Sequence, residues 1–290
     1  MTHPTLLSGL SEVTARYDAL LCDIWGVIHN GRQHFPPAYD ALKKFKAERG
    51  PVVLISNSPR PRDDLIAQLA SLGIMEDGFS DVVSSGDATR EYLRKFAPQG
   101  PAWRIGPPRD DVLYAGIDIA FTSQPDAAAF ISCSGPFDDE NDTLDQYSHA
   151  FTIAARRKLV MICANPDKVV QRGDKIIMCA GSLADLYASL GGPVIMAGKP
   201  YPPIYELCYA AQEKLTGKPA DKKRILAVGD GLPTDVLGAN GQGLDLVFIA
   251  AGIHVADATD DAGRLDPLRL KALLDVQTAE AKYVAEALRW

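Results

Sequence analysis

The sequence has no cluster of basic residues that would suit a polyanionic partner. No run of lysine or arginine stands out, the formal net charge is −7 and the pI is about 5.3. An acidic chain is repelled by nucleic acid and by anionic membrane surfaces. We therefore expect no nucleic-acid partner and no membrane partner, and any anionic substrate has to be held by a few local positive charges.

Cysteines, long apolar runs and repeats are also scarce or missing. The five cysteines form neither a CxxC pair nor a zinc-type spacing, which favours buried thiols in a reducing compartment. No apolar stretch approaches the roughly 18 to 20 residues of a membrane span, and the first twenty residues lack the pattern of a secretory signal. Internal repeats and low-complexity segments are absent, which excludes solenoid and fibrous classes. We expect a soluble, cytoplasmic, globular protein.

The chain instead alternates short apolar runs with longer amphipathic segments, the pattern of βαβ units on a parallel sheet. The expected strands cover residues 19–27, 51–55, 82–84, 128–133, 159–164, 194–197, 225–228 and 246–250. The expected helices cover residues 36–48, 62–72, 88–96, 144–158, 203–215 and 268–288. The predicted fold class is α/β with a Rossmann-like parallel sheet. Residues 1–97 and 193–290 form its core, and residues 98–192 form a second α/β domain.

Residues with useful chemistry follow several of these strands, and the ends of strands are where ligands bind in open α/β sheets. Asp23 closes the run in LLCDIWGV, Ser56 and Asn57 close VVLISN, and Lys199 follows VIMAG. Each has an ordinary explanation when it is considered alone. An aspartate there is often a turn residue, a serine is often a helix N-cap, and a lysine is often solvated.

The most specific pattern is GDGLPTD, residues 229–235, which follows another apolar strand. Asp230 and Asp235 are five positions apart, so both carboxylates belong to one loop. Paired carboxylates of this kind hold a hard cation such as Mg²⁺.

In this order the four places resemble the four motifs of the haloacid dehalogenase (HAD) superfamily, over residues 18–252. The resemblance implies a Rossmann-like core with an α/β cap domain inserted between motifs two and three. Within that insertion, ANPD and AGSL resemble the cap of class IIA, the NagD-like sugar phosphatases. It implies that cap residues close over the leaving group and select it, and we nominate Asn165, Asp167, Gly181 and Ser182. Homodimers built through the cap occur in this class, so a homodimer is also an option.

The resemblance further implies a phosphatase with Mg²⁺ as cofactor and a small phosphorylated metabolite, a sugar or polyol phosphate, as substrate. Asp23 is then the nucleophile that forms an aspartyl-phosphate, and Asp23, Asp230 and the backbone carbonyl of Trp25 hold the metal. The remaining motif residues have the following implied roles: Ser56, Lys199 and the amide of Asn57 clamp the phosphate, and Asp235 orients Lys199 and the water molecules on the metal.

One position departs from the family pattern. Phosphatases of this superfamily carry a second aspartate two residues after the nucleophile, and here that residue is Trp25. An indole cannot exchange protons, so general acid-base help of about 10²- to 10⁴-fold has to be missing or supplied elsewhere. His29 is near in sequence and titrates near neutrality when unperturbed, although a turn histidine is the simpler interpretation.

Two alternatives to the phosphatase therefore remain open. The first is another hydrolase that uses an ester at Asp23, either a dehalogenase or a phosphonatase. The intact GDGLPTD argues against a dehalogenase, and neither Lys168 nor Lys175 can be assigned the Schiff-base role of a phosphonatase from sequence. The second is a catalytically silent protein that keeps the fold and binds phosphate.

Overall fold

The computed structural model describes residues 4–172, 175–250, 258–260, 264–276 and 278–290. The chain divides into two compact units, each made of separate segments. The first unit comprises Met1–Ser56, Ile66–Val83 and Tyr205–Trp290, and the second comprises Asn57–Leu65 and Ser84–Ile204. Among the helices of the described residues, none combines the length and the apolar character needed to cross a membrane.

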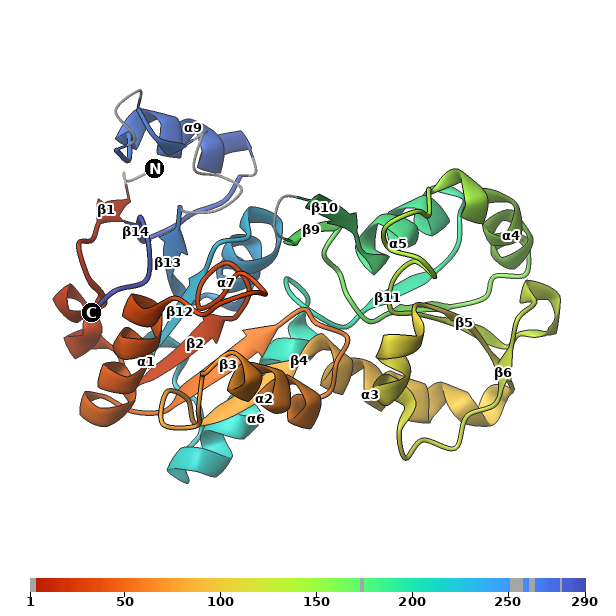
Figure 1. Ribbon diagram of the computed structural model, residues 1–290, viewed down its shortest axis with the longest axis horizontal. Helices are drawn as coiled ribbons and strands as arrows, with labels where there is room; N and C mark the ends of the chain where they lie inside the picture. Colours follow the sequence, from red (N-terminus) through yellow and green to blue (C-terminus); the bar gives the residue numbers. More distant parts are fainter. Residues whose placement is uncertain (1–3, 173–174, 251–257, 261–263, 277) are drawn as a thin grey trace. The chain divides into compact units, whose positions relative to one another are not determined.

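A seven-stranded sheet forms the centre of the first unit, in the order β1-β14-β13-β12-β2-β3-β4. Its strands are β1 (Thr5–Leu6), β2 (Ala19–Asp23), β3 (Val52–Ser56), β4 (Asp81–Ser84), β12 (Ile225–Gly229), β13 (Asp245–Ile249) and β14 (Tyr283–Ala285). Every residue of β2, β3 and β12 is buried, which explains why these strands are continuous apolar runs in the sequence. Both β3 and β12 pair with β2 in parallel, so strands far apart in the chain lie side by side (Figure 1).

The helices associated with this sheet are α1 (Pro36–Glu48), α7 (Leu237–Gln242) and α9 (Pro267–Val276), while α2 (Arg62–Ser71) and α6 (Pro202–Thr216) cross from one unit to the other. Prolines occupy the first turn of α1, where the missing N–H groups cost nothing. The prediction of a helix over residues 268–288 is wrong beyond Val276. Tyr283–Ala285 is instead a strand, buried between β13 and β1, and it pairs in parallel with both.

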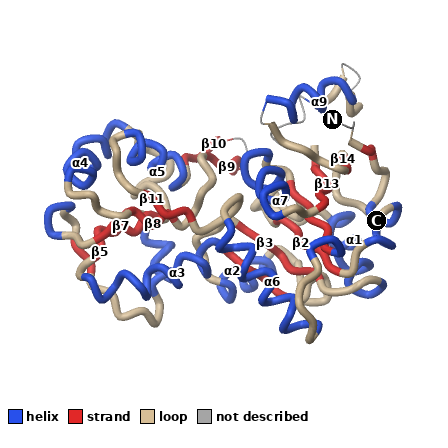
Figure 2. The backbone as a smooth tube through the Cα atoms, turned by 180° about the vertical axis from the view of Figure 1, so that it is seen from behind, coloured by secondary structure: helices blue, strands red, loops and turns tan. Residues whose placement is uncertain are grey.

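The second unit has its own five-stranded sheet, in the order β11-β8-β7-β5-β6. These strands are β5 (Ala102–Ile105), β6 (Phe121–Thr122), β7 (Phe130–Cys133), β8 (Met161–Cys163) and β11 (Val194–Met196). An antiparallel hairpin of β9 (Val169–Arg172) and β10 (Lys175–Met178) adds a separate pair of strands, which is not predicted from the sequence. Figure 2 shows this unit as strands with helices on either side.

The two faces of this second sheet bury different clusters, because side chains alternate along each strand. Ile131 and Met161 contribute to the core beneath α4 (Asp145–Arg156) and α5 (Ala180–Ser189). Phe130 and Ile162 contribute to the other core, which includes Leu93 of α3 (Ser85–Phe96). The second unit is therefore a three-layer α/β/α sandwich.

Two elements expected in the core domain belong to this second unit. Strand β11 pairs in parallel with β8, and α3 packs on the sheet through Leu93, with Phe96 partly buried against the same cluster. The division of the structure thus differs from the expected boundaries at residues 97 and 193. This division follows from the packing of the apolar face of α3 on the second sheet and from the pairing of β11 with β8. Neither contact can be recognised in the local sequence.

Candidate functional site

Three carboxylates from two neighbouring strands come together in the first unit. Asp23 is the last residue of β2, Asp230 follows β12 directly, and Asp235 lies in the turn beyond it. One carboxylate oxygen from each lies within 4.8 Å of the others, and Asp23 and Asp235 are 6% and 5% exposed. Three like charges this close repel one another unless a cation neutralises them. A set of hard oxygen donors fits Mg²⁺ or Ca²⁺, so these residues fit the metal that the sequence suggests.

Glycines give these carboxylates the space they occupy. A Cβ on Gly26, whose φ is +82°, would lie 2.0 Å from Oδ2 of Asp230. A Cβ on Gly229 would lie 2.2 Å from Cγ of Asp235. The π-helical turn over Leu232–Val236 brings Asp235 back, so that its Oδ2 accepts a hydrogen bond from the N–H of Gly231 at 3.1 Å. The acidic group thus depends on close backbone approaches that only glycine allows.

Trp25, the residue that replaces the expected aspartate, is half-buried in the loop after β2. Its indole meets the ring of His29 edge to face at 5.2 Å, and a Cβ on Gly31 would lie 2.3 Å from the indole. The loop closes because the N–H of Gly26 donates to the carbonyl of His29 at 2.9 Å. Trp25 is therefore packed against its own loop. Its backbone carbonyl as a metal ligand stays a prediction.

His29 is a buried part of this turn. Its Nδ1 accepts a hydrogen bond from the N–H of Gly31 at 3.0 Å, and its side chain is 2% exposed. Burial lowers the pKa of His29 to about 4. A neutral imidazole with this pKa is a poor general acid at neutral pH, so the structure favours the turn histidine over a replacement for the missing aspartate.

Ser56 ends strand β3 and Asn57 follows it directly, but the two residues belong to different units. Ser56 follows Ile55, whose register partner is Asp23, and Ser56 is 7% exposed. In the second unit, Oδ1 of Asn57 accepts from the N–H of Lys199 at 2.7 Å, and Nδ2 donates to the carbonyl of Lys199 at 3.1 Å. Lys199 itself is 3% exposed. The structure therefore brings together two residues that the sequence separates by 142 positions.

The four nominated cap residues form one cluster in the second unit. The N–H of Asp167 donates to Oδ1 of Asn165 at 3.0 Å, and the N–H of Gly181 donates to the carbonyl of Asp167 at 3.0 Å. A Cβ on Gly181 would lie 2.2 Å from the carbonyl oxygen of Pro166, and the hydroxyl of Ser182 donates to Lys168 O at 2.8 Å. Gly181 and Ser182 thus have local bonding partners, and their part in selecting a leaving group stays a prediction.

The link between this cluster and Lys199 is not predicted from the sequence. Nδ2 of Asn57 also donates to Oδ1 of Asp167 at 2.8 Å, so one buried amide joins Asp167 to the backbone of Lys199. The three residues come from three separate strand ends. No local sequence pattern predicts their contact, although Asn57 and Gly198 each lie directly beside a motif residue.

Comparisons with known proteins agree on one family. A family model described as haloacid dehalogenase-like hydrolase matches residues 20–119, and a HAD-hydrolase-like model matches residues 196–276. The crystal structure of a haloacid dehalogenase-like hydrolase from Brucella suis 1330 is 40% identical, with a TM-score of 0.85, over 97% of this chain and 98% of that one.

Two curated relatives point to a branch of that family. The D-glycerol 3-phosphate phosphatase of Mycobacterium tuberculosis is 25% identical over 90% of this chain and 69% of its own length. The ribonucleotide monophosphatase NagD of Escherichia coli K12 is 26% identical over 83% of this chain and 90% of its own length. The resemblance to class IIA is thereby confirmed, and the chain belongs to the haloacid dehalogenase-like hydrolase family.

Proposed function

We propose that this chain is a magnesium-dependent phosphatase that hydrolyses a small phosphomonoester, a sugar or polyol phosphate, through an aspartyl-phosphate at Asp23. The observation that carries the proposal is the group of three carboxylates at the ends of β2 and β12. A nucleophile beside a cation is what phosphoryl transfer needs. The relatives named as a glycerol phosphate phosphatase and a nucleotide monophosphatase support a phosphomonoester as the substrate.

Asp23, Asp230 and the carbonyl of Trp25 would hold the metal ion, with Asp235 beside them. A bound Mg²⁺ neutralises charge on the phosphoryl oxygens and fixes the phosphate for attack. The donor set is made of oxygen atoms alone, which suits this ion better than a softer metal.

Asp23 then acts on the phosphorus atom. One carboxylate oxygen forms a bond to phosphorus while the bond to the leaving oxygen breaks, and that oxygen takes its proton from water because the indole of Trp25 is too weak an acid to supply it. A water molecule next attacks the phosphorus of the aspartyl-phosphate, its proton passing to solvent. The acyl phosphate bond breaks, which releases inorganic phosphate and restores Asp23.

The remaining residues bind and orient. Ser56, Lys199 and the backbone amide of Asn57 bind the phosphate oxygens, and Asp235 orients Lys199. Residues 98–192 serve as the cap, and Asn165, Asp167, Gly181 and Ser182 close over the leaving group.

Trp25 also supports a second candidate function, a silent phosphate-binding protein. The burial of His29 and its low pKa leave that histidine a poor substitute for the aspartate, so both catalytic steps proceed without general acid-base help from it. Activated leaving groups should therefore be preferred, since they depart without a proton.

A screen of aryl, glycerol, sugar and nucleotide monophosphates, with magnesium and with excess chelator, tests the proposal. We expect hydrolysis that requires magnesium, and its loss in Asp230→Asn. Hydrolysis that persists fully in chelator would reject the metal role. Binding of phosphate without turnover of any ester would favour the silent protein instead.

A further inference from the structure

The side chain of Asn57 is at the centre of a buried network in the second unit. It is 3% exposed, yet each of its polar atoms has a partner. Its Oδ1 accepts from the N–H of Lys199, and its Nδ2 donates both to the carbonyl of Lys199 and to Oδ1 of Asp167. Only this orientation of the amide places NH₂ toward the carboxylate and oxygen toward the N–H.

The carboxamide of Asn57 is therefore hydrogen-bonded to both the N–H and the carbonyl of Lys199. The preceding Gly198 makes the approach feasible, because a Cβ there would lie 2.4 Å from Oδ1 of Asn57 and 2.8 Å from Oγ of Ser85. Since Lys199 is itself buried, a fixed backbone leaves its side chain little freedom. Asn57 thus fixes the backbone from which the side chain of Lys199 extends.

Asp167 in turn holds Asn57. Its Oδ1 accepts from Nδ2 of Asn57 at 2.8 Å, a hydrogen bond strengthened by the charge of the carboxylate. The backbone of Asp167 is fixed on both sides, by Oδ1 of Asn165 and by the N–H of Gly181, each at 3.0 Å. Asn165 and Gly181 therefore fix the loop conformation in which the Asp167 carboxylate points toward Asn57.

We propose that Asp167 is a positioning residue, which acts through Asn57 to fix Lys199. It then sets the affinity for the phosphate group that all substrates share, instead of selecting the leaving group. The inference rests on the proposed function in that Lys199 binds phosphate, and it departs from the selecting role that the family resemblance suggests for Asp167.

Titration of the full-length protein with inorganic phosphate, in the presence of magnesium, separates the two roles because phosphate has no leaving group. We expect Asp167→Ala to weaken phosphate binding about three- to tenfold, the range for loss of one hydrogen bond of typical net strength. Asp167→Asn should recover most of this loss, since its Oδ1 still accepts from Asn57. A contact of the Asp167 charge with substrate would be lost in both variants. Asp185→Ala is the matched control, because Asp185 is half-exposed in the same unit and pairs with Lys168.

A double-mutant cycle adds a second readout. Asn57→Ala should weaken phosphate binding at least as much as Asp167→Ala, and the double variant should be no weaker than Asn57→Ala alone. KM for every ester should rise by one common factor in Asp167→Ala. If Asn57→Ala does not fold, the comparison of Asp167→Ala with Asp167→Asn is sufficient.

The outcomes distinguish this inference from the proposed function. Unchanged phosphate affinity in Asp167→Ala, or a loss that Asp167→Asn does not recover, overturns the positioning role while leaving the phosphatase intact. A wild-type protein that binds phosphate but hydrolyses no ester refutes the phosphatase, and the same titrations still decide the role of Asp167. A wild-type protein that binds no phosphate overturns both.

Discussion

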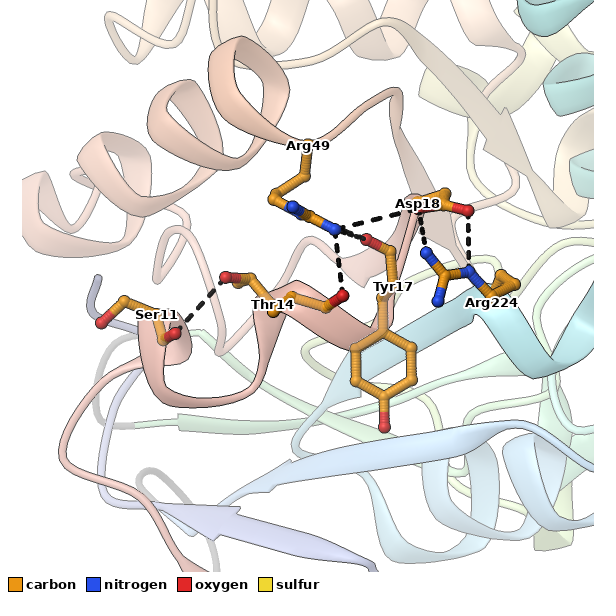
Figure 3. A network of polar contacts seen from close by, with 7 residues as sticks. Ser11, Thr14, Tyr17, Asp18, Arg49 and Arg224 are labelled. Atoms are coloured by element: carbon orange, nitrogen blue, oxygen red, sulfur yellow. Dashed lines mark hydrogen bonds and ion pairs between the residues drawn. The ribbon is translucent and has the colours of Figure 1, made fainter.

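Strands β2 and β12 are neighbours in the main sheet and carry charged residues at both ends, yet the two ends are built in opposite ways. At the amino end, Asp18 and Arg224 form a bidentate ion pair, with Nε of Arg224 at 2.8 Å from Oδ2 of Asp18 (Figure 3). At the carboxyl end, Asp23 and Asp230 bring carboxylate oxygens within 4.8 Å of each other. Opposite charges meet at one edge of the sheet, and like charges meet at the other.

The difference separates what folding explains from what function explains. The Asp18–Arg224 pair is neutral as a unit and needs no partner from outside the chain. Buried like charges repel one another, so the carboxylate group is an arrangement that a bound cation would favour. A fold under selection for stability alone would not keep such an arrangement, so the carboxyl edge is where a function has to be sought.

The largest expected effect comes from one substitution made at both edges. Asp23→Asn should lower kcat on an aryl phosphate by at least about 10³-fold, because an amide cannot serve as the nucleophile. Asp18→Asn, the same change at the amino edge, should keep kcat within about twofold of wild type, since it touches only the surface ion pairs with Arg224 and Arg49. Steady-state rates with magnesium measure both. Equal losses in the two variants would remove the functional distinction between the edges.

A second effect concerns Trp25, which lies just beyond the carboxyl edge. Without a carboxylate to activate water, breakdown of the aspartyl-phosphate should be slower than its formation for a good leaving group. Rapid mixing with an activated aryl phosphate should then give a burst near one equivalent.

Trp25→Asp should speed the slow phase by about tenfold or more, the lower range of general base help. The control is Trp25→Phe, which keeps an aromatic ring and supplies no carboxylate. A wild-type enzyme without a burst, together with a folded Trp25→Asp variant that is no faster, would contradict this and favour the silent protein.

The carboxyl edge should also respond to metal in the absence of substrate. In chelator, Asp230→Asn should stabilise the fold by about 1 kcal/mol, because it removes one of three like charges. Magnesium should stabilise the wild type by about 2.7 kcal/mol at a hundred times its Kd, and should stabilise the variant much less. Thermal unfolding with and without magnesium measures both differences. A variant that is less stable than wild type in chelator would mean that the contacts of Asp230 outweigh the repulsion among the carboxylates.

The features that depend on neighbouring residues in the chain are predictable from the sequence. The helix over Pro36–Glu48 is confirmed with the expected bounds, because the two prolines fix its first turn. Strands β2, β3 and β12 were visible as apolar runs, and Asp23 and Asp230 as the charged residues that follow them. Residue chemistry and position at the strand ends are enough to predict that these carboxylates lie close together.

The parts that were missed depend on contacts between distant segments. The amphipathic helix α3 could have covered either sheet, and its packing against Phe130 decides which. Tyr283–Ala285 form a strand because β13 and β1 offer edges on both sides. The contacts of Asn57 with Asp167 and Lys199 span 110 and 142 residues, and no short motif encodes them.

The smallest expected effect belongs to the amino edge. Hydrogen bonding to Arg224 lowers the pKa of Asp18 below its ordinary 3.8. A carboxyl group with a lowered folded pKa contributes stability above its unfolded pKa, and that stability is lost as the pH falls through the folded value. Both side chains are about half exposed, so solvent screens the pair, and Arg224→Ala should destabilise the fold only slightly at neutral pH.

This cost should shrink in high salt and disappear well below pH 3.8, where Asp18 is protonated in both states. Denaturant unfolding of Arg224→Ala, Asp18→Asn and the double variant measures it, and at neutral pH the double variant should be no less stable than Arg224→Ala. A cost that stays constant through the acid range would assign the contribution of Arg224 to packing of its side chain and not to charge. The contrast between the two edges would then rest on the carboxylates alone.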